Sequence, residues 1–375
     1  MAKNTIYPGA TLGILGGGQL GRMIVLEGKK MGYRVVCLDP QKGSPCGQVA
    51  DEEIIGSLDD LNAARQLAEK SDVLIYEFEN LDVGVVKSLE EEYCLPQGSS
   101  LLGISQNRRI EKESIQEAGF PVAPFEIINH PDDLDTAVDR LALPAVLKTT
   151  TGGYDGKGQM VIRTTHDLAE AKMLVSQAGI QWVLEKMINF THEISVIVAR
   201  DQEGESLVYP VGENIHRDNI LHMTIVPARV DTHFQEEAQT IAKGIAEAFK
   251  LVGLLVIEFF VTEQGVIVNE MAPRPHNSGH YSFDVCYTSQ FEQLIRAVCG
   301  LPLGSVEIFS EAVMVNILGE NLSKVVNGIP SFPENVKVHL YGKTGDPEPK
   351  RKVGHVTIKT TDVDETITWA LENLV

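Results

Sequence analysis

The sequence predicts a mixed α/β protein: a parallel βαβ unit, then a larger region of strands and helices, then a small closing domain. Residues 11–100 alternate short runs of Val, Ile and Leu with helical patterns, which is typical of a parallel sheet. Pro121 and Pro124 mark a boundary, after which apolar strands are joined by turns. A chain of 375 residues is long enough for two or three domains with their own cores.

The predicted elements follow from where apolar runs, glycines and prolines fall. Before the boundary we expect strands 11–16, 34–39 and 72–77, a helix 19–32 closed by a glycine, and a polar helix 107–119. After it we expect strands 144–150, 160–163, 182–186, 193–200, 254–261, 265–272, 312–319, 336–342 and 354–359, with helices 165–179, 234–250 and 289–300. Thr165 is the expected N-cap of the helix that it begins.

Composition and charge limit the function classes. A net charge of −20 disfavours nucleic acid or an anionic membrane as a partner, but a small anionic ligand needs only a local basic cluster. The five cysteines form no C-x-x-C pair, which predicts reduced thiols in a cytoplasm. The longest apolar run, 251–261, contains Glu258 and is shorter than the roughly 20 residues that span a bilayer. We expect a cytoplasmic protein without a signal peptide.

A glycine-rich stretch near the start raises the question of a dinucleotide. Gly16, Gly18 and Gly21 have the G-x-G-x-x-G spacing between a predicted strand and a helix, and the next strand ends in Asp39. This spacing alone is a weak signal, and it leaves a dinucleotide-dependent oxidoreductase open.

Two carboxylates near the middle of the chain predict a cation site. Each of two apolar strands is expected to carry a carboxylate at its end, Glu258 on one and Glu270, next to Asn269, on the other. If the two strands are antiparallel neighbours, the carboxylates converge and repel each other unless a cation lies between them. Oxygen ligands of this kind suit Mg²⁺ with nucleotide phosphates. The alternative is that each glutamate is paired with a lysine.

Further polar residues are ambiguous by themselves. Lys148 ends a strand before a glycine-rich turn, 151–159, whose amides could approach phosphate; the alternative is a surface hairpin. Glu185 and Lys186 end a strand that is either an edge strand or the hinge of a nucleotide pocket. Glu193 is similarly ambiguous, and His216 among polar neighbours is typical of a surface histidine.

Taken in order, the lysine at a strand end, the glycine lid, the Glu-Lys hinge and the Glu…Asn-Glu strands resemble the ATP-grasp superfamily over nearly the whole chain. The stretches "GGGQLGRM", "TGGYDGKGQ", "APRPHNSGH" and "YGK…RKVGH" are similar to those of N5-carboxyaminoimidazole ribonucleotide synthetases. A related family, the formate-dependent glycinamide ribonucleotide formyltransferases, has a serine-rich lid and an S-P-R-P-H-D-T-G-type loop, from which this sequence departs.

The resemblance implies an ATP-grasp fold with a Rossmann-like pre-ATP-grasp domain 1–103, an ATP-grasp domain 104–303 with a lid subdomain at about 120–187, and a C-terminal domain 304–375. It implies a carbon–nitrogen ligase of purine biosynthesis that carboxylates the exocyclic amine of 5-aminoimidazole ribonucleotide with bicarbonate, through carboxyphosphate, giving ADP and phosphate. The implied cofactors are ATP and Mg²⁺, without NAD or biotin. The implied partners are a second copy, as a homodimer, and a mutase that takes the product.

The resemblance also implies a role for individual residues at each ligand. The expected ATP contacts are Arg108, Lys148, Gly153, Tyr154, Asp155, Gly156, Lys157, Gly158, Gln159, Glu185, Lys186, Met187, Ile188, Glu193, His216, Asn269 and Glu270. The expected ribonucleotide and bicarbonate contacts are Gln19, Leu20, Glu79, Tyr154, Asp155, Arg274, His276, Asn277, Ser278, Lys343 and Arg351. Arg274, His276 and Lys343 are the expected catalytic residues, and Glu258 and Glu270 the expected metal ligands.

In this interpretation the glycine loop binds the phosphate of the ribonucleotide through its amides and the helix N-terminus. Asp39 then becomes an ordinary strand-end residue. Glu77 competes with Glu79 for the substrate contact, because both are expected on one side of a strand. Besides the oxidoreductase, another ATP-grasp ligase and a non-catalytic nucleotide-binding regulator remain as alternatives; a regulator would be expected to lack a metal carboxylate.

Overall fold

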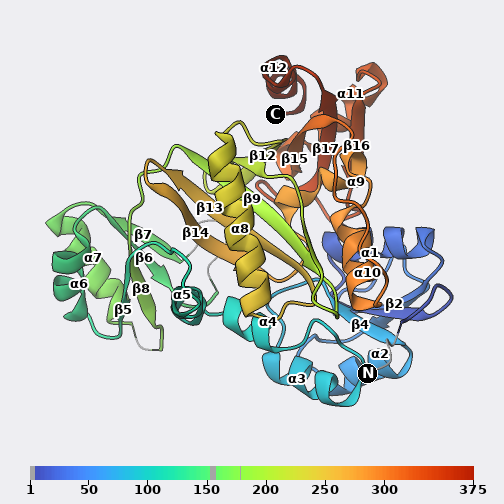
Figure 1. The fold of residues 1–375 in the computed structure, drawn as a ribbon, viewed down its shortest axis with the longest axis horizontal. Coiled ribbons are helices and arrows are strands. Elements are labelled where there is room, and N and C mark those ends of the chain that lie inside the picture. Colours follow the sequence, from blue (N-terminus) through green and yellow to red (C-terminus); the bar gives the residue numbers. More distant parts are fainter. Residues whose placement is uncertain (1–4, 153–157, 178) are drawn as a thin grey trace.

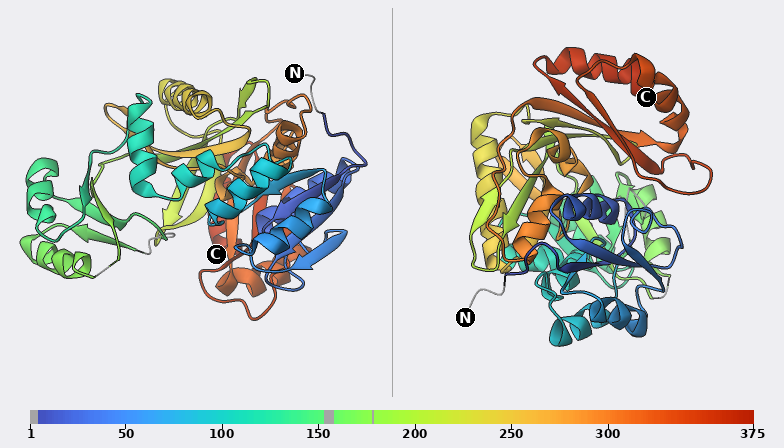
Figure 2. Two further views of the ribbon diagram at one scale, coloured as in Figure 1. Left: turned by 90° about the horizontal axis from the view of Figure 1, so that it is seen from below. Right: turned by 90° about the vertical axis from the view of Figure 1, so that its right-hand side faces the viewer.

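The computed structural model describes residues 5–152, 158–177 and 179–375. Within this part the strands form three sheets, of four, nine and four strands (Figure 1). The two smaller sheets lie on different sides of the large one, so the molecule has a central body and two lobes (Figure 2).

The N-terminal lobe is a parallel sheet, as the alternating pattern predicts. Its strands have the order β3-β2-β1-β4, and each pair is parallel. The elements are β1 (Thr11–Leu15), α1 (Gln19–Lys30), β2 (Arg34–Asp39), β3 (Glu52–Ile55), α2 (Leu61–Glu69), β4 (Val73–Tyr76), α3 (Val83–Glu92) and α4 (Ser100–Ser105). Strand β3 was not predicted, because its short Glu-Glu-Ile-Ile sequence contains no apolar run.

The second small sheet is the lobe that carries the glycine-rich turn. Its strands have the order β5-β8-β6-β7 and are antiparallel. The elements are β5 (Phe125–Ile128), α6 (Asp133–Leu141), β6 (Ala145–Thr149), β7 (Gln159–Ile162), α7 (Thr165–Val175) and β8 (Trp182–Lys186). The expected N-cap Thr165 is wrong by one residue: Thr164 caps α7, and Asp167 completes a capping box with it.

Helix α5 (Arg108–Glu117) lies between this lobe and the central sheet (Figure 1). Asn107 caps its N-terminus through bonds from the amides of Arg109 and Ile110. Two consecutive charged residues on the helix, Glu111 and Lys112, are buried. A helix that buries charge must meet charged or polar partners, and this makes α5 part of the site described below.

The central sheet has the order β14-β13-β9-β11-β12-β15-β17-β16, with β10 paired to β9. Its strands are β9 (His192–Arg200), β10 (Ser206–Val208), β11 (Gly212–Arg217), β12 (Ile220–Val226), β13 (Gly253–Thr262), β14 (Gly265–Ala272), β15 (Glu311–Leu318), β16 (Val336–Leu340) and β17 (Lys352–Thr360). The helical segments around it are α8 (Thr232–Ala248), η1 (Asn277–Gly279), α9 (Ser282–Val285), α10 (Gln290–Val298), η2 (Gly319–Asn321), α11 (Leu322–Gly328), η3 (Ile329–Ser331) and α12 (Val363–Leu374).

The closing domain expected at residues 304–375 does not form a sheet of its own. Strand β15 pairs with β12 in antiparallel register, with Met223 opposite Val315 and Val226 opposite Ala312. The sheet therefore continues without interruption from the middle of the chain into its C-terminal part.

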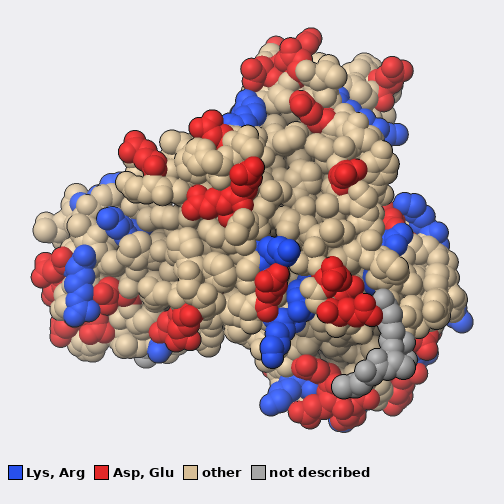
Figure 3. Space-filling view, viewed as in Figure 1, with Lys and Arg blue, Asp and Glu red and all other residues tan. Residues whose placement is uncertain are grey.

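The N-terminal lobe and the central sheet share one hydrophobic core. Residues of β1 and α1 pack with α10 and β13, including Leu12, Ile24, Phe291 and Leu254. Gly28 allows this close packing, because a Cβ there would lie 3.1 Å from Leu12. In the described part of the chain, no helix is long and apolar enough to cross a bilayer. Acidic and basic side chains are interspersed on the face in Figure 3, which presents no broad basic area.

We expect Phe291→Ala to lower the free energy of unfolding by about 3–5 kcal/mol, because it leaves a cavity in this shared core. Phe291 is 0% exposed, whereas the control Phe309 is 52% exposed. Phe309→Ala should cost less than about 1 kcal/mol. Urea unfolding followed by circular dichroism measures both. Equal losses for the two variants would contradict a core shared by the lobe and the sheet.

Candidate active site

The glycine loop before α1 is closed over two carboxylates of its own lobe. The amide of Gly17 donates to Oδ2 of Asp39 and the amide of Gly18 to Oε1 of Glu77, both at 2.8 Å. A Cβ at Gly17 would lie 2.5 Å from the Cβ of Asp39, so the close approach requires glycine. Asp39 is therefore more than a strand-end residue, because its carboxylate fixes the loop.

This pairing leaves only part of the loop for a ligand. The amides of Gln19 and Leu20 have no acceptor among the residues that the structure describes. The amides of an α-helix's first turn attract anions. The anion site predicted for the whole loop thus narrows to the first two residues of α1.

The two glutamates after β4 have different environments. The strand ends at Tyr76, so the prediction that Glu77 and Glu79 lie on one side of a strand is wrong. Glu77 is buried beneath the loop, where burial raises the pKa of its carboxyl group against the effect of the Gly18 amide. Glu79 is partly exposed and forms an ion pair with Arg274. Glu79 is thus the one that reaches the polar loop after β14.

A cluster of buried charges lies where α5 meets β6 and β8. Oε2 of Glu185 is 2.9 Å from Nζ of Lys148 and 3.3 Å from Nζ of Lys112. Burial favours the neutral form of Glu185, but Lys112, Lys148 and Arg108 outweigh it and lower its pKa to about 2. Burial also lowers the pKa of Lys148, against the pull of Glu185. Oε2 of Glu185 is therefore engaged by two lysines, while its Oε1 has no hydrogen-bond partner among the described residues.

Lys112 is a functional candidate that was not predicted. Its signal was the spacing of Arg108 and Lys112, which places both side chains on one face of a helix. The guanidinium of Arg108 is also 3.8 Å from Glu270. Between them, Glu111 accepts a bond from the amide of Met271, the residue after Glu270, at 2.8 Å. Helix α5 thus contacts both the lobe and the strand with the predicted metal ligand.

The predicted pair of carboxylates is confirmed as neighbours. Strands β13 and β14 are antiparallel, with Glu258 directly opposite Glu270 and a bulge after Glu258. Burial, and next the charge of Glu270, raise the pKa of Glu258 to about 8, although His216 partly offsets them. In the described residues the guanidinium of Arg108 is 3.8 Å from Glu270, and Nδ1 of the His276 ring is 3.9 Å from Glu258. The charge of Lys352 also acts on Glu258, so the facing carboxylates agree with the predicted cation site without deciding against the alternative of lysine pairing.

Two residues on the neighbouring strands extend this site. Nδ1 of His216 on β11 is 2.9 Å from Oε2 of Glu193 on β9. Burial lowers the pKa of His216, but the bond and charge of Glu193 raise it overall. The side chain of His216 is 21% exposed, so its interpretation as a surface histidine is wrong. Both side chains lie on the sheet that also carries Glu258.

Two of the three backbone amides in the expected hinge after β8 already donate hydrogen bonds within the protein. The amide of Lys186 donates to the carbonyl of Pro124 and that of Met187 to the carbonyl of Pro144. Of the three hinge amides, only that of Ile188 has no acceptor within the described residues. The expected lid residues Gly153, Tyr154, Asp155, Gly156 and Lys157 lie outside the described residues, while Gly158 and Gln159 lead into β7.

Hydrogen bonds to α10 and β15 hold the polar loop after β14 in place. The amide of His276 donates to Oε1 of Gln290 at 3.0 Å, and its Nδ1 is 2.9 Å from Oγ of Ser278. Nδ2 of Asn277 donates to Oδ1 of Asn316 on β15 at 2.8 Å. Burial, and next the charge of Arg274, hold the pKa of His276 well below its usual value, so the ring is neutral.

The turn between β16 and β17 brings cations to the glycine loop. Gln48 and Gln41 of the N-terminal lobe bond to Gly342 and Thr344 in this turn, both at 2.6 Å. Lys343 lies between these contacts, and burial together with Arg351 lowers its pKa to about 8. The structure thus brings the predicted basic turn next to α1, from the other end of the chain.

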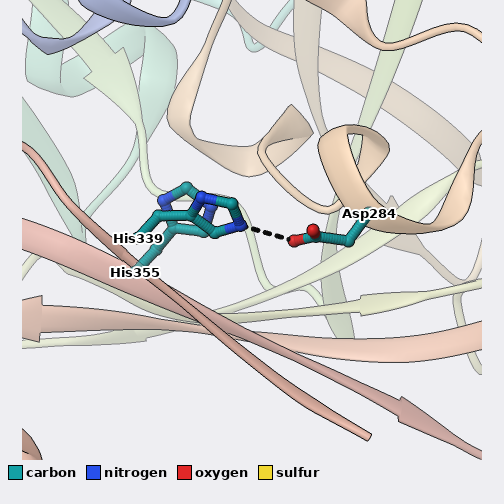
Figure 4. A group of neighbouring side chains, drawn as sticks. All are labelled: Asp284, His339 and His355. Carbon is teal, nitrogen blue, oxygen red and sulfur yellow. Dashed lines mark hydrogen bonds and ion pairs between the residues drawn. The ribbon is translucent and has the colours of Figure 1, made fainter.

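A histidine cluster fastens this turn to the polar loop (Figure 4). His339 on β16 is 2.9 Å from Asp284 on α9, and its ring stacks on that of His355 at 4.5 Å and 18°. The hydroxyl of Tyr341 lies 3.0 Å from Nδ1 of His355. Such nearly parallel rings direct their nitrogen lone pairs side by side and not toward one point, which is poor geometry for a shared metal ion. The cluster instead fixes the start of the turn.

Three family models together match most of the chain. They are a ribonucleotide synthetase preATP-grasp domain over residues 9–106, an ATP-grasp domain over 113–291 and a phosphoribosylaminoimidazole carboxylase C-terminal domain over 312–368. With the facing carboxylates and the buried lysines, these matches define an ATP-grasp ligase.

Comparison with similar proteins identifies the family within the class of ATP-grasp ligases. An N5-carboxyaminoimidazole ribonucleotide synthase of Bacillus subtilis is 50% identical over 98% of this chain and 96% of its own length. The chain belongs to the N5-carboxyaminoimidazole ribonucleotide synthase family. A solved synthetase of this family in complex with ADP has a TM-score of 0.95 at 49% identity, covering 99% of this chain and 98% of its own. One from Aspergillus clavatus, solved with ADP and 5-aminoimidazole ribonucleotide, has a TM-score of 0.89 at 31% identity, covering 97% of each chain.

We expect Glu258→Gln to stabilise the metal-free protein in a pH-dependent way. In the wild type, the folded state keeps the proton of Glu258 up to about pH 8, while the unfolded state loses it near the ordinary pKa of 4.5. Wild-type stability therefore falls as the pH rises through this window, and glutamine does not titrate. The advantage of the variant should grow from pH 5 to pH 8, by a few kcal/mol at roughly 1.4 kcal/mol per unit.

Denaturant unfolding in EDTA at several pH values measures this difference. Glu263→Gln, in the exposed turn between the same two strands, is the control and should show no such trend. A difference for Glu258→Gln that stays constant with pH would contradict the buried, repelled carboxyl group.

Proposed function

We propose that this protein carboxylates the exocyclic amine of 5-aminoimidazole ribonucleotide, with ATP and bicarbonate, to give N5-carboxyaminoimidazole ribonucleotide, ADP and phosphate in purine biosynthesis. The observation that carries the proposal is the pair of facing carboxylates, Glu258 and Glu270, beside Arg108 and the buried lysines. Such a set suits a nucleotide triphosphate with its metal ion. Relatives of this name were solved with ADP and with the ribonucleotide, which supports the choice of substrates.

The nucleotide would lie between the lobe of β5–β8 and the central sheet. Lys148 and Arg108 would meet its phosphates, and Glu193 with His216 its ribose. The carbonyls of the hinge and the amide of Ile188 would meet adenine. Glycines of the turn 151–159 would cover the phosphates.

The residues present fit Mg²⁺. Glu258 and Glu270 would hold the ion, with Asn269 beside them, since two facing carboxylates without a cation repel each other. When bound, Mg²⁺ neutralises negative charge that develops on the phosphates.

Bicarbonate is a poor electrophile and must be activated. In the proposed reaction its oxygen attacks the γ-phosphorus of ATP, ADP leaves, and carboxyphosphate forms. Arg274, fixed by Glu79, would hold the anion through charge-assisted bonds. The neutral ring of His276 would lie next to it and can accept a proton when the amine attacks the carbon and phosphate leaves.

The ribonucleotide would lie between α1 and the turn after β16. The amides of Gln19 and Leu20 with the cations of Lys343 and Arg351 would bind its phosphate. Tyr154 and Asp155 of the lid would also contact the ribonucleotide. Carboxyphosphate hydrolyses readily, so closure of the lid would exclude water during the transfer.

The first experiment measures ADP release with Mg-ATP and bicarbonate, with and without 5-aminoimidazole ribonucleotide. Strong stimulation by this nucleotide, with one carboxylated product per ADP, is the expected result. Turnover only with formate and glycinamide ribonucleotide would replace the proposal with the neighbouring ligase. An absence of ATP turnover under every condition would refute a ligase activity.

We expect Lys343→Ala to raise the KM for the ribonucleotide by roughly 10- to 100-fold, the value of a charge-assisted bond, and to leave the KM for ATP unchanged. In the wild type, Lys343 loses its proton above about pH 8, so the KM for the ribonucleotide should increase there. The alanine variant should lose this pH dependence.

Steady-state kinetics between pH 6.5 and 9.5 test both effects. Lys350→Ala is the matched control, because Lys350 lies in the same turn with its side chain 62% exposed. An equal rise in the two KM values for Lys343→Ala would argue against the assigned geometry.

A further inference from the structure

One buried carboxylate between β6, β8 and α5 is shared by two lysines. Lys112 and Lys148 both reach Oε2 of Glu185, at 3.3 and 2.9 Å. Arg108 adds a third cation that faces the same carboxylate. Nζ of Lys112 and Oε1 of Glu185 are buried and have no hydrogen-bond partner among the described residues. Of the three cations, Arg108 is shared with Glu270, and Arg108 and Lys112 also act on the buried Glu111, so Lys112 and Lys148 are the two cations that directly pair with Glu185.

The two lysines differ in their access to the site. Only 1% of the Lys112 side chain is exposed, against 16% for Lys148. Lys148 is followed closely by the glycine-rich turn, whereas Lys112 extends from a helix capped by Asn107. Lys148 can therefore meet a nucleotide phosphate, and Lys112 is enclosed within the protein.

Binding of a phosphate would change the balance at Glu185. When the ammonium of Lys148 turns to a phosphate, its bond to Glu185 weakens. A carboxylate buried in this way would then take up a proton unless another cation stays beside it. Lys112 is the cation in a position to stay, since its helix is also bonded to β14 through Glu111 and the amide of Met271.

We infer that Lys112 is a positioning residue that acts as the permanent counter-ion of Glu185, keeping it ionised while Lys148 turns to the phosphate of the bound nucleotide. The inference rests on the proposed assignment of Lys148 to phosphate. It goes beyond that assignment, because Lys112 itself does not touch the nucleotide.

The test is the number of protons taken up when Mg-ADP binds. Isothermal titration at pH 7 in two buffers of different ionisation enthalpy measures this number together with the affinity. The wild type should take up no proton at Glu185. Lys112→Met, which keeps the length but removes the charge, should take up as much as one additional proton and bind on the order of 10-fold more weakly. Lys112→Arg should restore both values.

A matched control lies on the same helix. Arg109 pairs with Glu113 at 3.0 Å, and its side chain is 41% exposed. Arg109→Met should leave affinity and proton uptake at the wild-type values. Unchanged uptake in a folded Lys112→Met variant would overturn the inference, even if its affinity fell, because a purely structural role would weaken binding without moving a proton.

A double variant keeps the inference testable if Lys112→Met alone does not fold. Lys112→Met with Glu185→Gln removes both the cation and the carboxylate, so Glu185 is no longer there to take up a proton. It should fold, bind Mg-ADP without additional proton uptake, and bind more tightly than Lys112→Met. Effects of the two substitutions that simply add would overturn the inference. Unchanged ADP affinity in Lys148→Met would instead refute the phosphate assignment on which it rests.

Discussion

The pairing of β13 with β14 is the constraint on which the site depends. It places the largely buried Glu258 opposite the half-exposed Glu270, whose charge disfavours the ionised form of Glu258. Arg108 of α5 lies beside Glu270, and the neutral ring of His276 in the polar loop lies beside Glu258. A strand pair that is costly for the isolated protein is thus what the proposed cation and nucleotide site rests on.

The net charge of the chain is −20, yet its fold collects a few cations from distant segments into enclosed places, where solvent screens them weakly. Lys112 comes from a helix and Lys148 from a strand, while Lys343 comes from a turn near the C-terminus. The net charge of this protein therefore does not predict the local charge in these enclosed places.

Sequence patterns predicted the features that depend on local order. Two apolar runs that each contain a glutamate located β13 and β14, and a family resemblance assigned their role. The expectation that Glu258 ends its strand is wrong, because β13 continues to Thr262 with apolar residues after the glutamate. The buried partners of the glycine loop, Asp39 and Glu77, could not be predicted, because their contacts join segments that are far apart in the sequence. Lys112 was missed for the same reason, and so was the pairing of β15 with β12, since a strand's neighbour is not encoded in its own residues.

The continuous sheet from β14 to β16 has a mechanical consequence. The ladder between β12 and β15 locks the turn that carries Lys343 to the same rigid body as the facing glutamates. The distance between that turn and the facing glutamates is therefore set by strand ladders when the chain folds. The sheet of β5–β8 lies outside this body and connects to it by two short stretches of chain, 118–124 and 187–191.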